Sequence, residues 1–267
     1  AWNCAVMRRF TSRIMPTTNS TITDTTGTDT TNRALFTTAP TYNANTNPFG
    51  SGVSGNGAND SIIFAEFSTY THNAGGSPFG AVGAGPVVVF ETGSEARILN
   101  ATNFQANGRT YADLTIGDGT SQVDASDGGS SDFQFDNLIV NSPATGGDFS
   151  SLSFTGTGTS TVTIQGDITS NGAAGGTFAD VILQGGSGGI VIDNSGGTIT
   201  FDNANSSVKS ILFNSDASVT TGTTLTLGRI LQMGLSANHL LTVDGSGTIN
   251  GASDAYVIGA IKKSVVP

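Results

Sequence analysis

The residues best suited to chemistry in this sequence are the carboxylates between positions 118 and 132. The segment carries Asp118, Asp124, Asp127 and Asp132, the densest acidic cluster of the chain. Carboxylate oxygens suit Ca²⁺, but an EF-hand loop needs acidic ligands at alternate early positions and a closing Glu, and this spacing does not match. Asp also favours loops and tight turns. We therefore expect a loop here, leave Ca²⁺ binding as the minor alternative, and assign no metal ligand.

Other catalytic constellations are missing from the sequence. His72 and His239 are the only histidines, and a lone His is a weak candidate for a general base. Gly186–Gly188 and Gly245–Gly247 enclose serines without the strand-to-helix context of a nucleophile elbow, so they indicate turns. Cys4 is the single cysteine, which excludes an internal disulfide and a Cys/His zinc cluster. We predict no catalytic, cofactor-binding or metal-binding residue, no cofactor, and a protein that is not an enzyme.

The composition bounds the class of protein and its partners. Charged residues make up 11% of the 267 positions, against about 25% in an ordinary globular domain. The net charge of −10 argues against nucleic acid as a partner, because phosphate binding needs clustered Lys and Arg. No apolar run approaches the length of a membrane helix, so we expect no membrane span. The N-terminus does not have the pattern of a signal peptide, and we expect a mature or trimmed product.

A repeated six-residue pattern is the main structural signal. It consists of an aromatic or branched residue, two small or polar residues, an aliphatic residue, any residue, and a large apolar one. The copies lie at 111–116, 135–140, 149–154, 178–183 and, more loosely, 208–213. The other apolar segments are about 3–6 residues long and are bounded by Gly, Asn, Asp or Ser, which is typical of short strands.

The spacing of the copies predicts a solenoid. Their central aliphatic residues are separated by steps of 24, 14, 29 and 30 residues, and most of these steps suit stacked repeats. We predict an all-β fold, a right-handed parallel β-helix (β-solenoid) over 61–267, preceded by an irregular N-terminal cap or linker over 1–60. The 14-residue step indicates either a copy on a different strand of the same coil or a deleted loop. A β-sandwich array is the main rival fold.

Stacked coils would align the repeated residues into two ladders inside the solenoid. One would be aliphatic and one aromatic, and Trp2 and Phe10 would cap the N-terminal end. The aliphatic ladder would hold Leu114, Leu138, Val181 and Ile211, and the aromatic ladder Tyr111, Phe135 and Phe178.

Several segments resemble large secreted β-helix surface proteins of Bacteroidetes. They are Trp2–Ala5, Ser12–Asn19, Thr69–Gly80, Val87–Ser94, the copies from Tyr111 onward, and the closing Gly247–Ile249 and Tyr256–Gly259. This resemblance implies export through the type IX pathway and an extracellular or cell-surface location. The C-terminal sorting domain of that group is absent here, and the group has no shared catalytic motif.

The expected function follows from the solenoid and this resemblance. We expect a non-catalytic structural protein or adhesin. Its Tyr256–Ile261 end has no recognisable cap, so either the chain continues in a longer protein or copies self-associate end to end into a filament or surface layer. The alternative is a β-helix that binds or cleaves polysaccharide. The residue motifs of the pectin-hydrolase β-helices do not occur in this sequence.

Overall fold

Short apolar segments between turn residues form 23 β-strands in the computed structural model of this chain, counted over the residues that it describes. A strand in these segments places alternate side chains on opposite faces, so that one face can be buried. The described residues are 34–36, 41–44, 62–73, 78, 88–101, 104, 106, 108–118, 123–141, 151–171, 181–194, 197–202, 211–228, 230–234 and 238–264.

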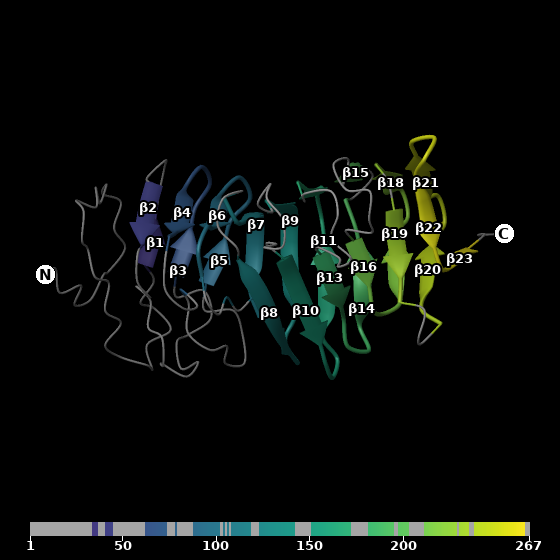
Figure 1. Ribbon diagram of the computed structural model, residues 1–267, viewed down its shortest axis with the longest axis horizontal. Helices are drawn as coiled ribbons and strands as arrows, with labels where there is room; N and C mark the ends of the chain where they lie inside the picture. Colours follow the sequence, from purple (N-terminus) through teal and green to yellow (C-terminus); the bar gives the residue numbers. More distant parts are fainter. Residues whose placement is uncertain are drawn as a thin grey trace, which may run out of the picture.

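The strands stack in three parallel ladders that run along the long axis of the molecule (Figure 1). A 17-stranded sheet contains the first and second ladders, and a six-stranded sheet is the third. The first ladder consists of β1 (Ala34–Phe36), β3 (Ile62–Phe64), β5 (Val88–Phe90), β7 (Thr110–Ile116), β9 (Phe133–Val140), β11 (Thr161–Ile164), β14 (Gly189–Ile192), β17 (Ala217–Val219), β20 (Leu240–Val243) and β23 (Ala260–Lys263).

The second ladder continues the same sheet around a corner. It consists of β2 (Thr41–Ala44), β4 (Thr69–His72), β6 (Glu95–Ile98), the later parts of β7 and β9, β12 (Ile168–Ser170), β15 (Thr198–Asp202), β18 (Thr224–Leu227) and β21 (Thr248–Gly251). The third ladder consists of β8 (Asp124–Gly129), β10 (Ser151–Gly156), β13 (Val181–Gln184), β16 (Ile211–Phe213), β19 (Ile230–Met233) and β22 (Tyr256–Ile258).

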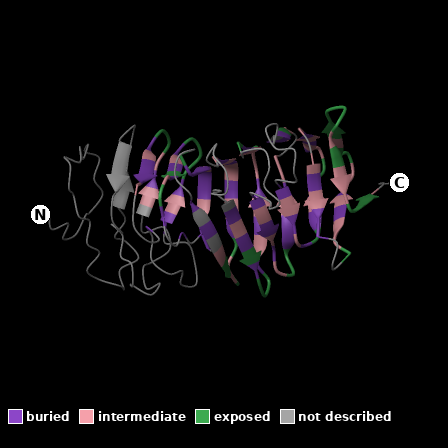
Figure 2. Cartoon of the chain, viewed as in Figure 1, coloured by how far each residue is buried: buried purple, intermediate pink, exposed green. Residues whose placement is uncertain are grey.

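Every one of these pairings is parallel, which confirms the predicted parallel β-solenoid and contradicts the β-sandwich. Its handedness stays a prediction. Buried and half-buried residues alternate along the strands (Figure 2), because each strand turns one face toward the interior. Each large apolar side chain buried in this way contributes roughly 1.5–3 kcal/mol to stability.

Aromatic rings fill the interior of the N-terminal coils. Phe64 and Phe90 stack with ring centroids 4.4 Å apart, and Phe90 and Tyr111 follow at 5.3 Å. Tyr111 lies in register with Phe135, as the repeat predicts. From there the same inward column continues with aliphatic residues, Ile164 and Ile192 first. Phe178, the third predicted member, lies outside the described residues.

The predicted aliphatic ladder is two ladders rather than one. Leu114 pairs with Leu138 as expected, but Leu138 pairs next with Ile168 in the second ladder. Val181 instead pairs with Leu152 in the third ladder. The 14-residue step therefore separates two different faces of the solenoid, which is the first of the two explanations that the sequence left open. The spacing could not reveal this, because an inward aliphatic residue looks the same on either face.

Two strands lie within 1–60, the segment predicted to be irregular. β1 pairs with β3 and β2 pairs with β4, so the stack already includes residues 34–36 and 41–44. The solenoid therefore begins before residue 61. The remainder of that segment, with Trp2 and Phe10, lies outside the described residues.

Candidate functional site

The chain turns from the first ladder to the second at one edge of the stack, which we call the polar corner. The four-residue turns 65–68, 91–94 and 220–223 lie there, and the strands β7 and β9 pass through it at Asp113 and at Asp136–Asn137. An open groove of about 400 Å³ follows this edge. Its lining consists of Thr92, Asp136, Asn137, Gln165, Gly166, Asp167, Asn194 and Thr198.

Hydrogen bonds connect successive coils along the corner. The side-chain amide of Asn137 donates from Nδ2 to Oδ1 of Asp113 at 2.7 Å, and its Oδ1 accepts the backbone N–H of Asp167 at 2.8 Å. Oδ1 of Asp167 in turn accepts the backbone N–H of Thr200 at 2.7 Å. We call Asp113, Asn137, Asp167 and Thr200 the polar spine. Because each bond joins two coils, the spine holds these side chains in fixed positions.

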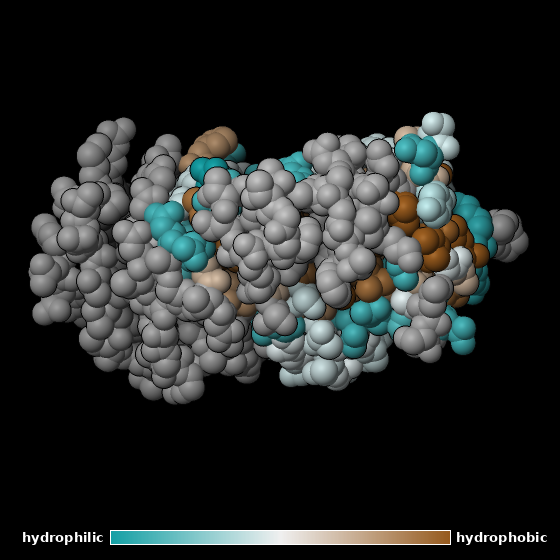
Figure 3. All heavy atoms as spheres, in the orientation of Figure 1, coloured by the Kyte–Doolittle hydropathy of each residue, from teal (hydrophilic) through white to brown (hydrophobic). Residues whose placement is uncertain are grey.

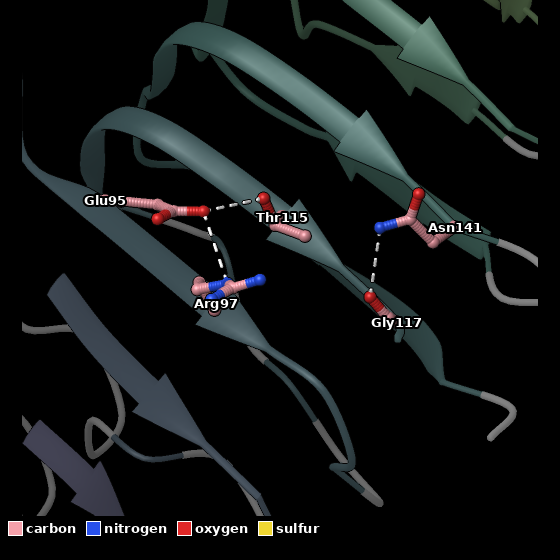
Figure 4. Close-up of polar contacts among 5 residues, drawn as sticks. All are labelled: Glu95, Arg97, Thr115, Gly117 and Asn141. Atoms are coloured by element: carbon pink, nitrogen blue, oxygen red, sulfur yellow. Dashed lines mark hydrogen bonds and ion pairs between the residues drawn. The ribbon is translucent and has the colours of Figure 1, made fainter. Parts of the chain in front are cut away.

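Two further polar contacts bridge the N-terminal coils on the outward face of the second ladder (Figure 4). Glu95 Oε1 accepts the hydroxyl of Thr115 at 3.2 Å and lies 3.4 Å from Nε of Arg97. The amide of Asn141 donates to the carbonyl of Gly117 at 3.3 Å. Glu95, Arg97 and Thr115 lie within the paired strands β6 and β7, whereas Gly117 and Asn141 directly follow β7 and β9, so the Asn141 bond extends the backbone ladder by one position.

Asp136 is the carboxyl of the groove with a perturbed acidity. Burial raises the pKa of Asp136, and the neighbouring charge of Asp113 raises it further. The groove thus combines a carboxyl whose charge is disfavoured with amide and hydroxyl groups. Such a lining can donate and accept hydrogen bonds with a ligand that carries hydroxyl groups.

Asp132, one of the predicted acidic candidates, and Asp216, which the sequence did not single out, both have structural contacts. Asp132, which precedes β9, accepts the backbone N–H of Thr161 at 2.8 Å. Asp216 precedes β17 and accepts the N–H of Leu240 at 3.0 Å. In both cases the carboxylate accepts the backbone N–H of the first residue of the strand that stacks on it from the next coil. These aspartates fix the stacking of coils.

The expected loop around the acidic cluster is partly wrong, because residues 124–129 form β8. Asp127 pairs in register with the buried Phe154, and its charge acts on the buried Arg109 and Tyr111. The sequence missed this strand because Asp, Ser and Gly dominate it. Over the described part of the chain, no group of three or more His, Cys, Asp or Glu could hold a metal ion.

The histidines and the glycine-flanked serines do not meet in one place. His72 is buried in β4, with its Nδ1 3.1 Å from the hydroxyl of Tyr70. His239 precedes β20, with its Nδ1 3.7 Å from Oδ1 of the exposed Asp216. Ser187 and Ser246 lie in turns, as predicted.

Sequence reasoning named no residue of the groove lining. The sequence signal that could have identified the groove is a polar residue that recurs where two short apolar stretches meet, as at Asn137 and Asp167.

No protein-family model, curated protein or solved structure matches this chain. Among the described residues there is no helix that is long and apolar enough to cross a membrane.

Proposed function

We propose that this protein is a non-catalytic, extracellular structural or adhesive β-solenoid. The observation that carries the proposal is that its carboxylates and side-chain amides form hydrogen bonds between successive coils. Asp132, Asp167 and Asp216 each accept a backbone N–H from the following coil, and Asn137 bonds to two coils at once. Groups that would serve as acids, bases or metal ligands in an enzyme here hold the stack together.

The proposed location rests on the segments that resemble secreted Bacteroidetes surface proteins. Export by the type IX pathway, as an adhesin or a matrix component, is part of the same proposal. Fractionation and immunogold labelling of the source cells test it. Label on the outer surface or in the matrix is expected, and label confined to the cell interior would refute the location.

Self-association is the proposed mode of assembly. The strands β21, β22 and β23 each have a single neighbour among the described residues, and all four residues of β23 are exposed. Ile261 and Tyr256 are both 52% exposed, and apolar surface gathers over β19 and β22 near this end (Figure 3). Parallel pairing of another copy on this edge would extend the stack without closing it, which produces filaments.

Electron microscopy and sedimentation of the 267-residue chain at rising concentration test the assembly. We expect filaments, and we expect Ile261→Lys to shorten or abolish them. The control is Ile139→Lys, which places the same charge on the outward side of β9 in the middle of the stack. Strictly monomeric particles at high concentration, or an equal effect of both variants, would refute assembly through this edge.

The open polar groove favours a second candidate, a β-solenoid that binds or cleaves polysaccharide. Incubation with plant, algal and bacterial polysaccharides, followed by detection of new reducing ends, separates cleavage from binding. Reproducible turnover that Asp136→Asn abolishes would overturn the non-catalytic proposal.

A further inference from the structure

The turn between β3 and β4 contains an unusual residue. Ser68 donates its backbone N–H to the carbonyl of Ala65 at 3.0 Å and closes a four-residue turn, and the third residue, Phe67, has φ of 65°. In the next coil, the turn 91–94 closes in the same way, and its third residue is Gly93 with φ of 82°. The turn 220–223 has Gly222 in that place, with φ of 84°. Phenylalanine therefore occupies a position that glycine occupies in equivalent turns.

The fold gains little packing from this phenylalanine. A left-handed backbone at a non-glycine residue costs roughly 1–2 kcal/mol. The Phe67 side chain is 65% exposed, so burial offsets only a minor part of this cost. The surroundings enforce the conformation, because the N–H of Phe67 donates to the carbonyl of Gly93 at 3.0 Å and the hydroxyl of Ser68 donates to Ala65 at 2.7 Å. Strain of this kind that is held in place by neighbours occurs at ligand-binding positions.

Phe67 is not itself a lining residue of the groove, but its turn lies next to the turn that carries the lining residue Thr92. Its backbone bonds to Gly93, and the adjacent Thr92 is a lining residue of the groove. The lining has no residue from the coil of β7 and continues over the coils of β9, β11 and β14 to Asn194 and Thr198. With coils about 4.8 Å apart, the distance from the Phe67 turn to Asn194 spans five steps, or roughly 24 Å. The exposed aromatic residue and the polar lining thus lie along the same edge of the rod.

The chemistry of this edge suits an extended sugar chain. An exposed aromatic ring offers a flat apolar face to the C–H face of a pyranose. The amides of Gln165 and Asn194 and the carboxylates of Asp136 and Asp167 can bond to neighbouring hydroxyl groups. The rise per coil is close to the length of one sugar residue in an extended glycan, so each coil can meet one residue. The carboxylates and the net charge of −10 disfavour an anionic polymer.

We propose that the polar corner binds a linear neutral polysaccharide, laid along the rod axis over Gln165, Asp167 and Asn194, with Phe67 stacking on one of its sugar rings. This inference rests on the proposed adhesive function: it names the class of ligand that the adhesin binds, and it requires no bond of that ligand to be cleaved. The polar spine holds Asn137 and Asp167 in position before the ligand arrives, which lowers the entropy lost on binding.

Binding of the 267-residue chain to β-glucan, xylan, mannan and anionic alginate, by affinity electrophoresis and calorimetry, tests the proposal. Phe67→Gly and Phe67→Ala should both weaken binding of the neutral polymer by about tenfold, which corresponds to about 1.4 kcal/mol. Phe67→Gly should also be more thermostable than Phe67→Ala, because glycine relieves the left-handed strain. Leu212→Ala, which removes an outward apolar side chain from β16 of the third ladder, is the control and should bind normally.

Each contrary outcome has a distinct meaning. Unchanged affinity of both Phe67 variants, or affinity that falls only as far as stability does, would refute the stacking role. Preference for alginate, or no binding of the wild-type chain to any of these polymers, would refute the ligand class while leaving the structural function in place. Release of reducing ends would refute the non-catalytic function itself.

Discussion

Replacing Asn137 by Ala removes the central member of the polar spine. The change deletes the 2.7 Å bond to the carboxylate of Asp113 and the 2.8 Å bond from the backbone N–H of Asp167. A hydrogen bond to a charged group contributes about 1.5–3 kcal/mol and a neutral one about 0.5–1.5 kcal/mol. Since Asn137 is half-buried, water replaces part of both bonds, and we expect a loss near the lower end of the sum, about 2 kcal/mol.

Urea unfolding followed by circular dichroism measures this loss as a shift of midpoint at constant slope. Hydrogen exchange at the backbone amide of Asp167 tests where the stability is lost. In the Asn137→Ala variant this N–H has lost its acceptor, so it should exchange faster than the amides of β20. The matched control is Asn141→Ala, which removes the bond to Gly117 at 3.3 Å and the bond from Asn171 at 2.8 Å, both between neutral groups. If Asn137→Ala were no more damaging than this control, the spine would not be a principal contact between coils.

Three further substitutions test the interior and the corner. Tyr111→Phe should stabilise the protein by about 1 kcal/mol, because the buried Tyr111 hydroxyl has no hydrogen-bond partner among the described residues, and a loss of stability in chemical unfolding would show that the hydroxyl is bonded. Asp136→Asn should raise the melting temperature at pH 7. The raised pKa means that the neutral carboxyl stabilises the fold at low pH and that this contribution is lost as pH rises through the folded-state value. The gain in melting temperature should therefore disappear in thermal melts at acidic pH. A gain that does not depend on pH would show that the charge of Asp136 is not its cause. Gly189→Ala should cost more than Gly158→Ala in thermal melts. Both glycines have positive φ, but a Cβ on Gly189 would lie 2.7 Å from the carbonyl oxygen of Asp216, whereas one on Gly158 would be 3.5 Å from its nearest neighbour, Cβ of Ser130. Equal losses would show that the backbone conformation alone sets the cost.

The repeat in the sequence predicted the fold class and part of the register. Tyr111 and Phe135 are paired as expected, because aromatic residues at equal places in successive coils have few other ways to be buried together. The assignment of copies to faces failed between Leu138 and Val181, since an inward aliphatic residue carries no mark of the sheet to which it belongs.

The sequence did not predict the strands that consist mostly of polar and small residues. β8 contains Asp124 and Asp127 with four small residues, a composition typical of a loop, yet parallel pairing with β10 makes it a strand. The sequence did not predict the groove either, for a related reason. Gln165 and Asn194 lie 29 residues apart in sequence, and only the coil register brings them to one edge. The sequence of residues 61–67 is typical of a strand that continues to Phe67, because left-handed backbone at a single residue leaves no periodic pattern.

The parallel register also limits the order in which the protein can fold. Asp113 bonds to a residue 24 positions later, and Asp167 to one 33 positions later, so contacts join each coil to the one just completed. The entropy of closing such loops depends on the length of one coil and not on the length of the chain. During synthesis each new coil can therefore be templated by its predecessor as soon as it leaves the ribosome. A whole inserted or lost coil would lengthen or shorten the rod while leaving every other contact as it was.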